Sequence, residues 1–281
     1  TGTVYNDEGV TPLASRTVAL SVNGGAANTT VETNAGGQFT FTSASGVTAG
    51  NVLTLYLDGE SEEAVTVTIA SGSTMTGVHL YRDSLIVRSE TGGVITNVHL
   101  ATADNSADGD ITGMYTMSTN DVTIGASDQI FVWTGSTFQP GAAVTAPTYD
   151  NRGVTTLVNN ETLTISTEFQ MTSGTFSGSG TVDLNDASYT QEEGSFTANG
   201  VFTVERNVTK NGGSFSGILL MDDDGYESLQ GTITCTSEFG GRLSINHTSS
   251  PANTMTIASG CTVTPDTATA WISEGNIVNN G

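Results

Sequence analysis

Residues 162–217 repeat one pattern three times: TLTISTEFQMTSGTFSGSG (162–180), TVDLNDASYTQEEGSFTANG (181–200) and VFTVERNVTKNGGSFSG (201–217). Each copy opens on alternating apolar residues and closes on glycine, then Thr or Ser, then phenylalanine. The phenylalanines recur at intervals of 20 and 19 residues, at Phe176, Phe196 and Phe215. A unit this short cannot bury its apolar face alone and must stack on copies of itself. The stretch therefore predicts a β-solenoid.

The rest of the C-terminal part keeps a looser form of this pattern. We expect residues 86–281 to form a right-handed parallel β-helix, with regular turns over 151–281. Residues 86–150 would be atypical first turns, because a terminal repeat must cover an otherwise exposed edge. There the alternation pairs residues such as Val94 with Val98. The final residues, NIVNNG, carry no polar cap, so we expect either further chain or a covered end.

Composition supports an all-β protein. Among the 281 residues, good helix formers are sparse, and 29 acidic residues face 7 basic ones, for a formal charge of −22. This charge opposes nucleic acid and anionic membranes as partners. No apolar run is long enough for membrane insertion. The chain opens on Thr1 without signal-peptide features, which fits a mature or excised extracellular product.

Residues 1–85 follow a different pattern. Short alternating segments such as Val18, Leu20 and Val22 are separated by turn signals every 8 to 12 residues, which indicates a β-sandwich. The sequence Asn23-Gly24-Gly25 is a strong signal for a hairpin.

The strings GTVYNDEGVTPL (2–13), VALSV (18–22) and TNAGGQFTF (33–41) resemble the carboxypeptidase-regulatory and Cna-B-like group of Ig-like surface modules. The resemblance implies an Ig-like β-sandwich that serves as a spacer or stalk in secreted and cell-surface chains. Some members of that group form a Lys–Asn isopeptide bond. Residues 1–85 contain no lysine, so that chemistry is not carried over.

Two further strings, ADNSADGDI (103–111) and FVWTGSTFQPG (131–141), resemble segments of large, repeat-bearing bacterial surface proteins of unassigned biochemical role. This resemblance implies a surface location and no active site.

Two acidic clusters are candidate metal sites. Asp104, Ser106, Asp108 and Asp110 match the start of a calcium loop, in which oxygen ligands alternate around a glycine. The match breaks at position 12, where Tyr115 replaces the bidentate Glu, and a solvated acidic turn is the alternative. The second cluster is less specific, since an exposed loop would also explain it; it comprises Asp222, Asp223 and Asp224.

Cys235 and Cys261 are the two cysteines, each in a Thr-rich segment. They either pair as a disulfide between neighbouring turns or are two small buried residues. Neither has the spacing of a zinc site.

An enzyme must also be considered, because parallel β-helices include polysaccharide lyases and hydrolases. The side chains suited to such chemistry in the regular turns are Asp183, Glu205, Arg206 and Lys210. A surface ion pair explains Glu205 and Arg206 more simply. The histidines His79, His99 and His247 are scattered, and no nucleophile motif is present.

These observations favour a structural protein without catalytic or cofactor-binding residues, calcium being the one cofactor left open. We expect a self-assembling, head-to-tail subunit of a cell-surface filament or sheath, which could also contact surface polysaccharide. The alternatives are a carbohydrate-binding or polysaccharide-cleaving β-helix protein and a fragment of a giant adhesin.

Overall fold

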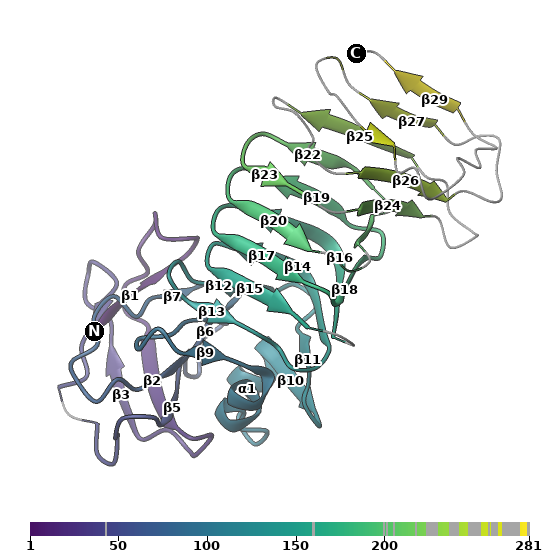
Figure 1. Cartoon of the computed structure of the whole chain (residues 1–281). Helices are drawn as coiled ribbons and strands as arrows, with labels where there is room; N and C mark the ends of the chain where they lie inside the picture. The colour runs from purple at the N-terminus through teal and green to yellow at the C-terminus, as the bar shows by residue number, and fades with distance from the viewer. Residues whose placement is uncertain are drawn as a thin grey trace. The chain divides into compact units, whose positions relative to one another are not determined.

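The chain is almost entirely β, and it forms a β-solenoid of about seven turns (Figure 1). The computed structural model describes residues 1–42, 44–158, 161–198, 200, 202–204, 206–216, 218–222, 230–235, 242–246, 254–257, 259, 264–265 and 276–279. It divides into two compact units, Thr1–Ala146 and Pro147–Gly281. This division differs from the boundary near residue 85 that the sequence suggests.

The first unit combines short strands with two short helices, α1 (Asn97–Ala103) and α2 (Gly109–Met114). Its strands are β1 (Gly2–Tyr5), β2 (Thr17–Val22), β3 (Thr29–Glu32), β4 (Gln38–Phe39), β5 (Val52–Leu57), β6 (Val65–Ile69), β7 (Leu80–Tyr81), β8 (Ser84–Val87), β9 (Val94–Ile95), β10 (Tyr115–Ser118), β11 (Asp121–Ile124), β12 (Gln129–Val132) and β13 (Thr137–Phe138). Strand β14 (Val144–Asn151) begins in this unit and ends in the second.

The hairpin predicted at Asn23-Gly24-Gly25 is confirmed. Strands β2 and β3 pair antiparallel on either side of it, and Asn23 and Gly24 have φ angles of 51° and 67°. Left-handed backbone of this kind matches the twist of the paired strands. Strand β5 pairs antiparallel with β2 and with β6, and a separate small sheet has the order β4-β1-β7. The assignment to the Ig-like modules stays a prediction.

Alternating apolar residues build the core of this part. The side chains that the sequence placed on one face pack together and are nearly inaccessible to solvent; they include Val18, Leu20, Phe39, Leu53, Leu55 and Leu57. From β6 onward the sheet contains parallel pairs: β6 pairs with β8, and β8 pairs with β12.

The sequence suggested atypical solenoid turns over residues 86–150, but two segments within them, 97–103 and 109–114, are helical. Thr96 caps α1, and Leu100 and Ala103 bury one face at the spacing of a helical turn. Asp108 caps α2 through its side chain, and Ile111 and Met114 repeat the same spacing. Val94 and Val98, paired in the sequence interpretation, are instead exposed, at 41% and 56%.

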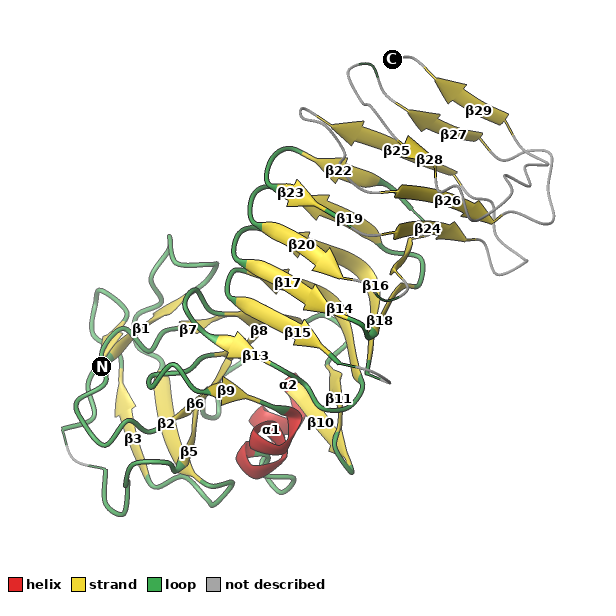
Figure 2. Ribbon diagram, in the orientation of Figure 1, coloured by secondary structure: helices red, strands yellow, loops and turns green. Residues whose placement is uncertain are grey.

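The second unit contains the solenoid turns that the repeats predict (Figure 2). Its strands are β15 (Val154–Leu157), β16 (Thr162–Met171), β17 (Thr175–Gly178), β18 (Thr181–Leu184), β19 (Ser188–Gln191), β20 (Ser195–Ala198), β21 (Phe202–Val204), β22 (Val208–Lys210), β23 (Ser214–Phe215), β24 (Ile218–Asp222), β25 (Gln230–Cys235), β26 (Arg242–Asn246), β27 (Thr254–Ile257), β28 (Thr264–Pro265) and β29 (Asn276–Asn279).

The register between turns is the one that the repeats imply. Strand β18 pairs in parallel with β16 and β21, so that the front positions of the three copies align. Leu163 lies beside Val182, which lies beside Phe202, and all three are buried. The backbone hydrogen bonds of each turn are therefore made to the next turn, as a parallel sheet requires.

The phenylalanines that mark the repeat form an internal stack. Strands β17, β20 and β23 align Phe176, Phe196 and Phe215, each no more than 3% exposed. The ring centroids of Phe176 and Phe196 are 5.2 Å apart, and those of Phe196 and Phe215 are 4.7 Å apart. The two pairs of rings are nearly parallel, at 2° and 5°. Identical residues in register thus produce one continuous aromatic column.

Glycines at equivalent positions of successive turns form the corner before this column. Gly174, Gly194 and Gly213 adopt positive φ there, and a Cβ at Gly174 would lie 1.9 Å from the Gly153 carbonyl oxygen. The buried Gln191 amide donates to the carbonyls of Gly194 and Ser214, at 3.3 and 3.0 Å. The inward Gln191 amide therefore bonds to corner carbonyls of its own turn and of the next one.

We predict that Phe196→Ala destabilises the second unit by about 3–5 kcal/mol, the range for removing a buried aromatic side chain. The ring packs between two others, so its loss leaves a cavity that the fixed register cannot close. Urea unfolding followed by circular dichroism measures the effect.

The control is Glu193→Ala, an exposed change in the preceding corner, which should cost less than about 0.5 kcal/mol. A cost for Phe196→Ala as small as that of the control would contradict the closed stack.

Candidate functional site

The first acidic cluster links the two helices. Asp104 follows the end of α1, and Asp108 caps α2 by accepting a hydrogen bond from the Asp110 amide at 3.1 Å. The Tyr56 hydroxyl donates to Asp108 at 2.8 Å, and the Gly59 amide donates to Asp110 at 2.8 Å. Protein donors therefore already occupy positions that a calcium ion would need.

The start of helix α2 explains why the calcium-loop pattern is incomplete. Helix α2 starts one residue after Asp108, so the second half of the twelve-residue pattern is helical and Tyr115 lies in β10. Within the described residues, no three His, Cys, Asp or Glu side chains gather as a metal site would need. Asp104 is half-buried, its Oδ1 lacks a partner, and burial raises its pKa. Calcium binding at Asp104, Ser106, Asp108 and Asp110 stays a prediction.

The other predicted sites fall largely outside the described residues. Asp222 ends β24, whereas Asp223, Asp224 and Cys261 lie beyond the residues that the structure covers. Cys235 ends β25, where its backbone pairs with that of Lys210. The second metal site and the disulfide are therefore untested.

Of the four polar residues considered for catalysis, Asp183 lies in β18 and Lys210 in β22. Arg206 makes an ion pair with Asp186, and Glu205 is outside the described residues. Lys210 is only 1% exposed and donates to the Gly213 carbonyl at 3.0 Å, in the same corner as the Gln191 amide. Burial lowers the pKa of Lys210. Its position indicates a role in the interior of the solenoid, like that of Gln191.

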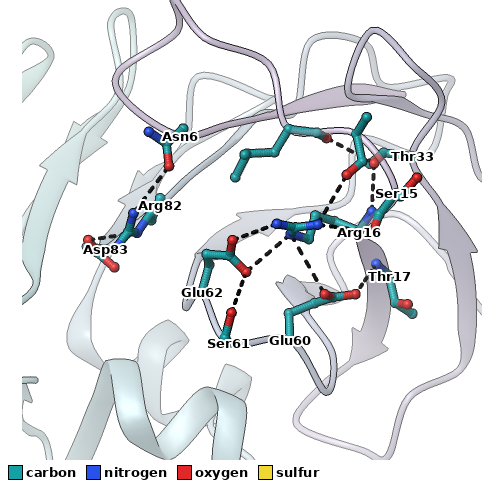
Figure 3. Close-up of polar contacts among 12 residues, drawn as sticks. Asn6, Ser15, Arg16, Thr17, Thr33, Glu60, Ser61, Glu62, Arg82 and Asp83 are labelled. Atoms are coloured by element: carbon teal, nitrogen blue, oxygen red, sulfur yellow. Dashed lines mark hydrogen bonds and ion pairs between the residues drawn. The ribbon is translucent and has the colours of Figure 1, made fainter.

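An arginine at the start of β2 holds two loops of the first unit together (Figure 3). Arg16 donates to Glu62 at 2.6 Å and lies 3.7 Å from a carboxylate oxygen of Glu60. The other Glu60 oxygen accepts from the Thr17 amide at 2.7 Å. Because these charges satisfy one another, the cluster positions the loop before β6 and leaves no reactive group.

Asp128 belongs to a group of carboxylates that sequence inspection missed. It is 7% exposed and packs against Gly125, where a Cβ would lie 2.1 Å from its Oδ2. Burial, with the nearby charges of Glu63 and Asp83, raises the pKa of Asp128 to about 6. The three acids come from separate segments, so no local motif signals them.

One face of the small sheet β4-β1-β7 borders a cavity. Strand alternation places Thr3 and Tyr5 of β1, Gln38 of β4 and His79 beside β7 on this face, opposite the core residues Val4 and Leu80. A cavity of about 370 Å³ opens there; its lining residues are Thr1, Gly2, Thr3, Asn34, Gln38, Phe39, Thr40, Gly77 and His79.

Aromatic rings continue this face from the cavity. The ring centroid of His79 lies 5.4 Å from that of Tyr5 and 5.7 Å from that of Trp133. Tyr81 lies beside Tyr5 on the same face, with ring centroids 5.8 Å apart, and is buried in a core cluster with Ile86 and Phe131. We call Thr3, Tyr5, Gln38, His79 and Trp133 the polar-aromatic face. Sequence inspection left His79 unassigned, because the face combines four segments that are distant in the chain.

We predict that Asp128→Asn stabilises the protein at pH 7.5 and has little effect at pH 4.5. The folded-state pKa is raised, so protonation of Asp128 favours folding at low pH and this contribution is lost as pH rises through about 6. Asn has nearly the shape of the protonated acid and stays uncharged at every pH. Urea unfolding at the two pH values measures the difference.

Glu32→Gln, at an exposed position on β3, is the matched control. It should leave the free energy of unfolding unchanged at both pH values. An equal effect of Asp128→Asn at both pH values would contradict the buried, charge-crowded environment.

Comparison of the chain with protein-family models, curated proteins and solved structures yields no significant match.

Proposed function

We propose that this protein is an extracellular structural subunit that assembles into a cell-surface filament or sheath. The observation that supports it most directly is the in-register stack of turns, in which the aligned phenylalanines form one column. In such a stack every turn is bonded to its neighbours along the same direction, which suits a component that carries load.

The outward side chains of the stack support the same proposal. Short hydroxyl residues align between turns: Thr156 and Ser177 are 3.3 Å apart, and Ser214 donates to Ser195 at 3.1 Å. These groups bond to one another and present a small-residue surface.

An edge strand of the first unit offers a place for a second copy. Within the described residues, β3 pairs only with β2. The Thr33 amide donates to Arg16, so antiparallel alternation turns the Thr30 amide away from β2. Unpaired edges of this kind recruit further strands. A neighbouring copy would add here, and repetition of this unlike contact would build a head-to-tail polymer.

The proposal includes a secreted location and no enzymatic activity. The two helices, of seven and six residues, are too short to cross a membrane, and the described residues contain no other helix. The Ig-like spacer module belongs to the same proposal and rests on the sequence resemblance alone. A fragment of a giant adhesin is the second candidate, since solenoid turns suit a long stalk equally well.

Negative-stain electron microscopy and light scattering of the purified chain test the proposal. We expect filaments or ordered oligomers that lengthen with protein concentration, over a range of salt and calcium concentrations. Isolated monomers under every condition would contradict assembly and favour the adhesin fragment.

Thr30→Pro should shorten or abolish the filaments while leaving the fold intact, because it removes only an outward amide of β3. Thr30→Val keeps that amide and serves as the control. Filaments unchanged by the proline would rule out β3 as the assembly edge.

A further inference from the structure

We propose that copies of this chain join by inserting Val10 of one copy into an apolar cavity of the next. This inference deepens the proposed assembly and rests on it, because it names a contact between neighbouring subunits. Both parts of the contact belong to the first unit: the tip of the loop between β1 and β2, which we call the Val10 tip, and a cavity of about 210 Å³. Among the described residues that line the cavity, none belongs to β3, so this contact can be tested separately from the β3 edge.

The Val10 tip presents an apolar side chain that hydrogen bonds hold in place at the surface. Val10 is 82% exposed. The Val10 and Thr11 amides both donate to Asp7 Oδ1, at 2.7 and 2.9 Å. Tyr5 then pairs with Pro12, which closes the loop. A side chain that is already fixed in one position loses little entropy when a partner buries it.

The cavity is lined mainly by apolar side chains. Leu20 of β2 and Leu53 and Leu55 of β5 belong to the core and form part of the lining. The connections before β5 and before β7 supply further apolar residues, which include Phe41, Ala44, Val47, Met75 and Val78. An apolar cavity of about 150 Å³ is large enough for benzene. A cavity of about 210 Å³ therefore accommodates the isopropyl group of a valine.

The Val10 tip and the cavity lie at opposite ends of β1, so one copy cannot fill its own cavity. Thr1, which precedes β1, lines the cavity, and its carbonyl accepts from the amide of Val78, which also lines it. The Val10 loop leaves the other end of β1, where a Cβ at Gly9 would lie 3.1 Å from the Tyr81 hydroxyl oxygen. The four residues of extended strand between them span roughly 10 Å. The contact therefore joins unlike surfaces of two copies, and its repetition can build a head-to-tail polymer.

The charges around the two parts favour this pairing over other contacts between copies. Asp7 and Glu8 precede Val10 in the loop, and the chain carries a formal charge of −22, so repulsion opposes most contacts that the loop could make. The described residues that line the cavity include no carboxylate, and the polar ones are threonine, serine and glycine-free hydroxyl positions only. The acidic loop can therefore approach the cavity without meeting a like charge in its lining.

Two variants that each lack one part of the contact test the inference in the full chain. Val10→Asp places a charge at the exposed tip and leaves the cavity intact, whereas Ala44→Phe fills the cavity and leaves the tip intact. We expect each variant alone to raise the protein concentration at which filaments appear by at least about tenfold, since the burial of one valine is lost at every contact. Light scattering measures that concentration.

An equimolar mixture of the two variants should form discrete dimers. The intact tip of the Ala44→Phe protein can enter the intact cavity of the Val10→Asp protein, and the pair then has no intact tip or cavity left for a third copy. Analytical ultracentrifugation measures this at a concentration between the filament threshold of the wild type and those of the variants. Each variant alone should be monomeric there.

Val98→Asp, at another exposed valine of the first unit, is the matched control and should assemble like the wild type. Val10→Asp changes an exposed loop residue and retains the fold, so the test stays decisive even if circular dichroism shows that Ala44→Phe misfolds. Filaments of Val10→Asp that form as readily as those of the wild type, or a mixture of folded variants that stays monomeric, would overturn the inference and leave the proposed assembly standing. Wild-type protein that is monomeric at every concentration would overturn both.

Discussion

The structure depends on the alignment of successive turns by parallel backbone hydrogen bonds. Once Leu163, Val182 and Phe202 share a register, the phenylalanines one strand further on must also align, and their rings stack. A slip of one residue would turn each of these side chains from the interior to the surface. The repeat in the sequence therefore reflects a constraint of packing.

The same constraint explains why polar groups occur inside the solenoid. A corner that turns the chain between two sheets leaves carbonyl oxygens buried, and the inward Gln191 and Lys210 donate to them. Lys210 is the single lysine of the chain and is almost completely buried. Its role in the corner accounts for a residue that the sequence alone placed among candidates for catalysis.

How much could be predicted from the sequence depended on whether the signal was local or repeated. The solenoid and its phenylalanine column were predictable, because three copies report the same positions. Helices α1 and α2 were missed, since each buries only two or three residues at helical spacing and lies among residues typical of strands. The polar-aromatic face was not predictable, because Tyr5, Gln38 and Trp133 meet only through strand pairing and ring contacts across 130 residues of chain.

The proposed mechanical role requires turns that are bonded mainly to their neighbours, and stretching single molecules from both ends tests this most directly. If each turn depends on the next, force should release the solenoid in successive steps of one turn, about 20 residues or roughly 70 Å of extended chain each. That stepwise pattern is the expected result. A single event that releases all the solenoid turns together would contradict the account, because it would require contacts that bind distant turns into one cooperative unit.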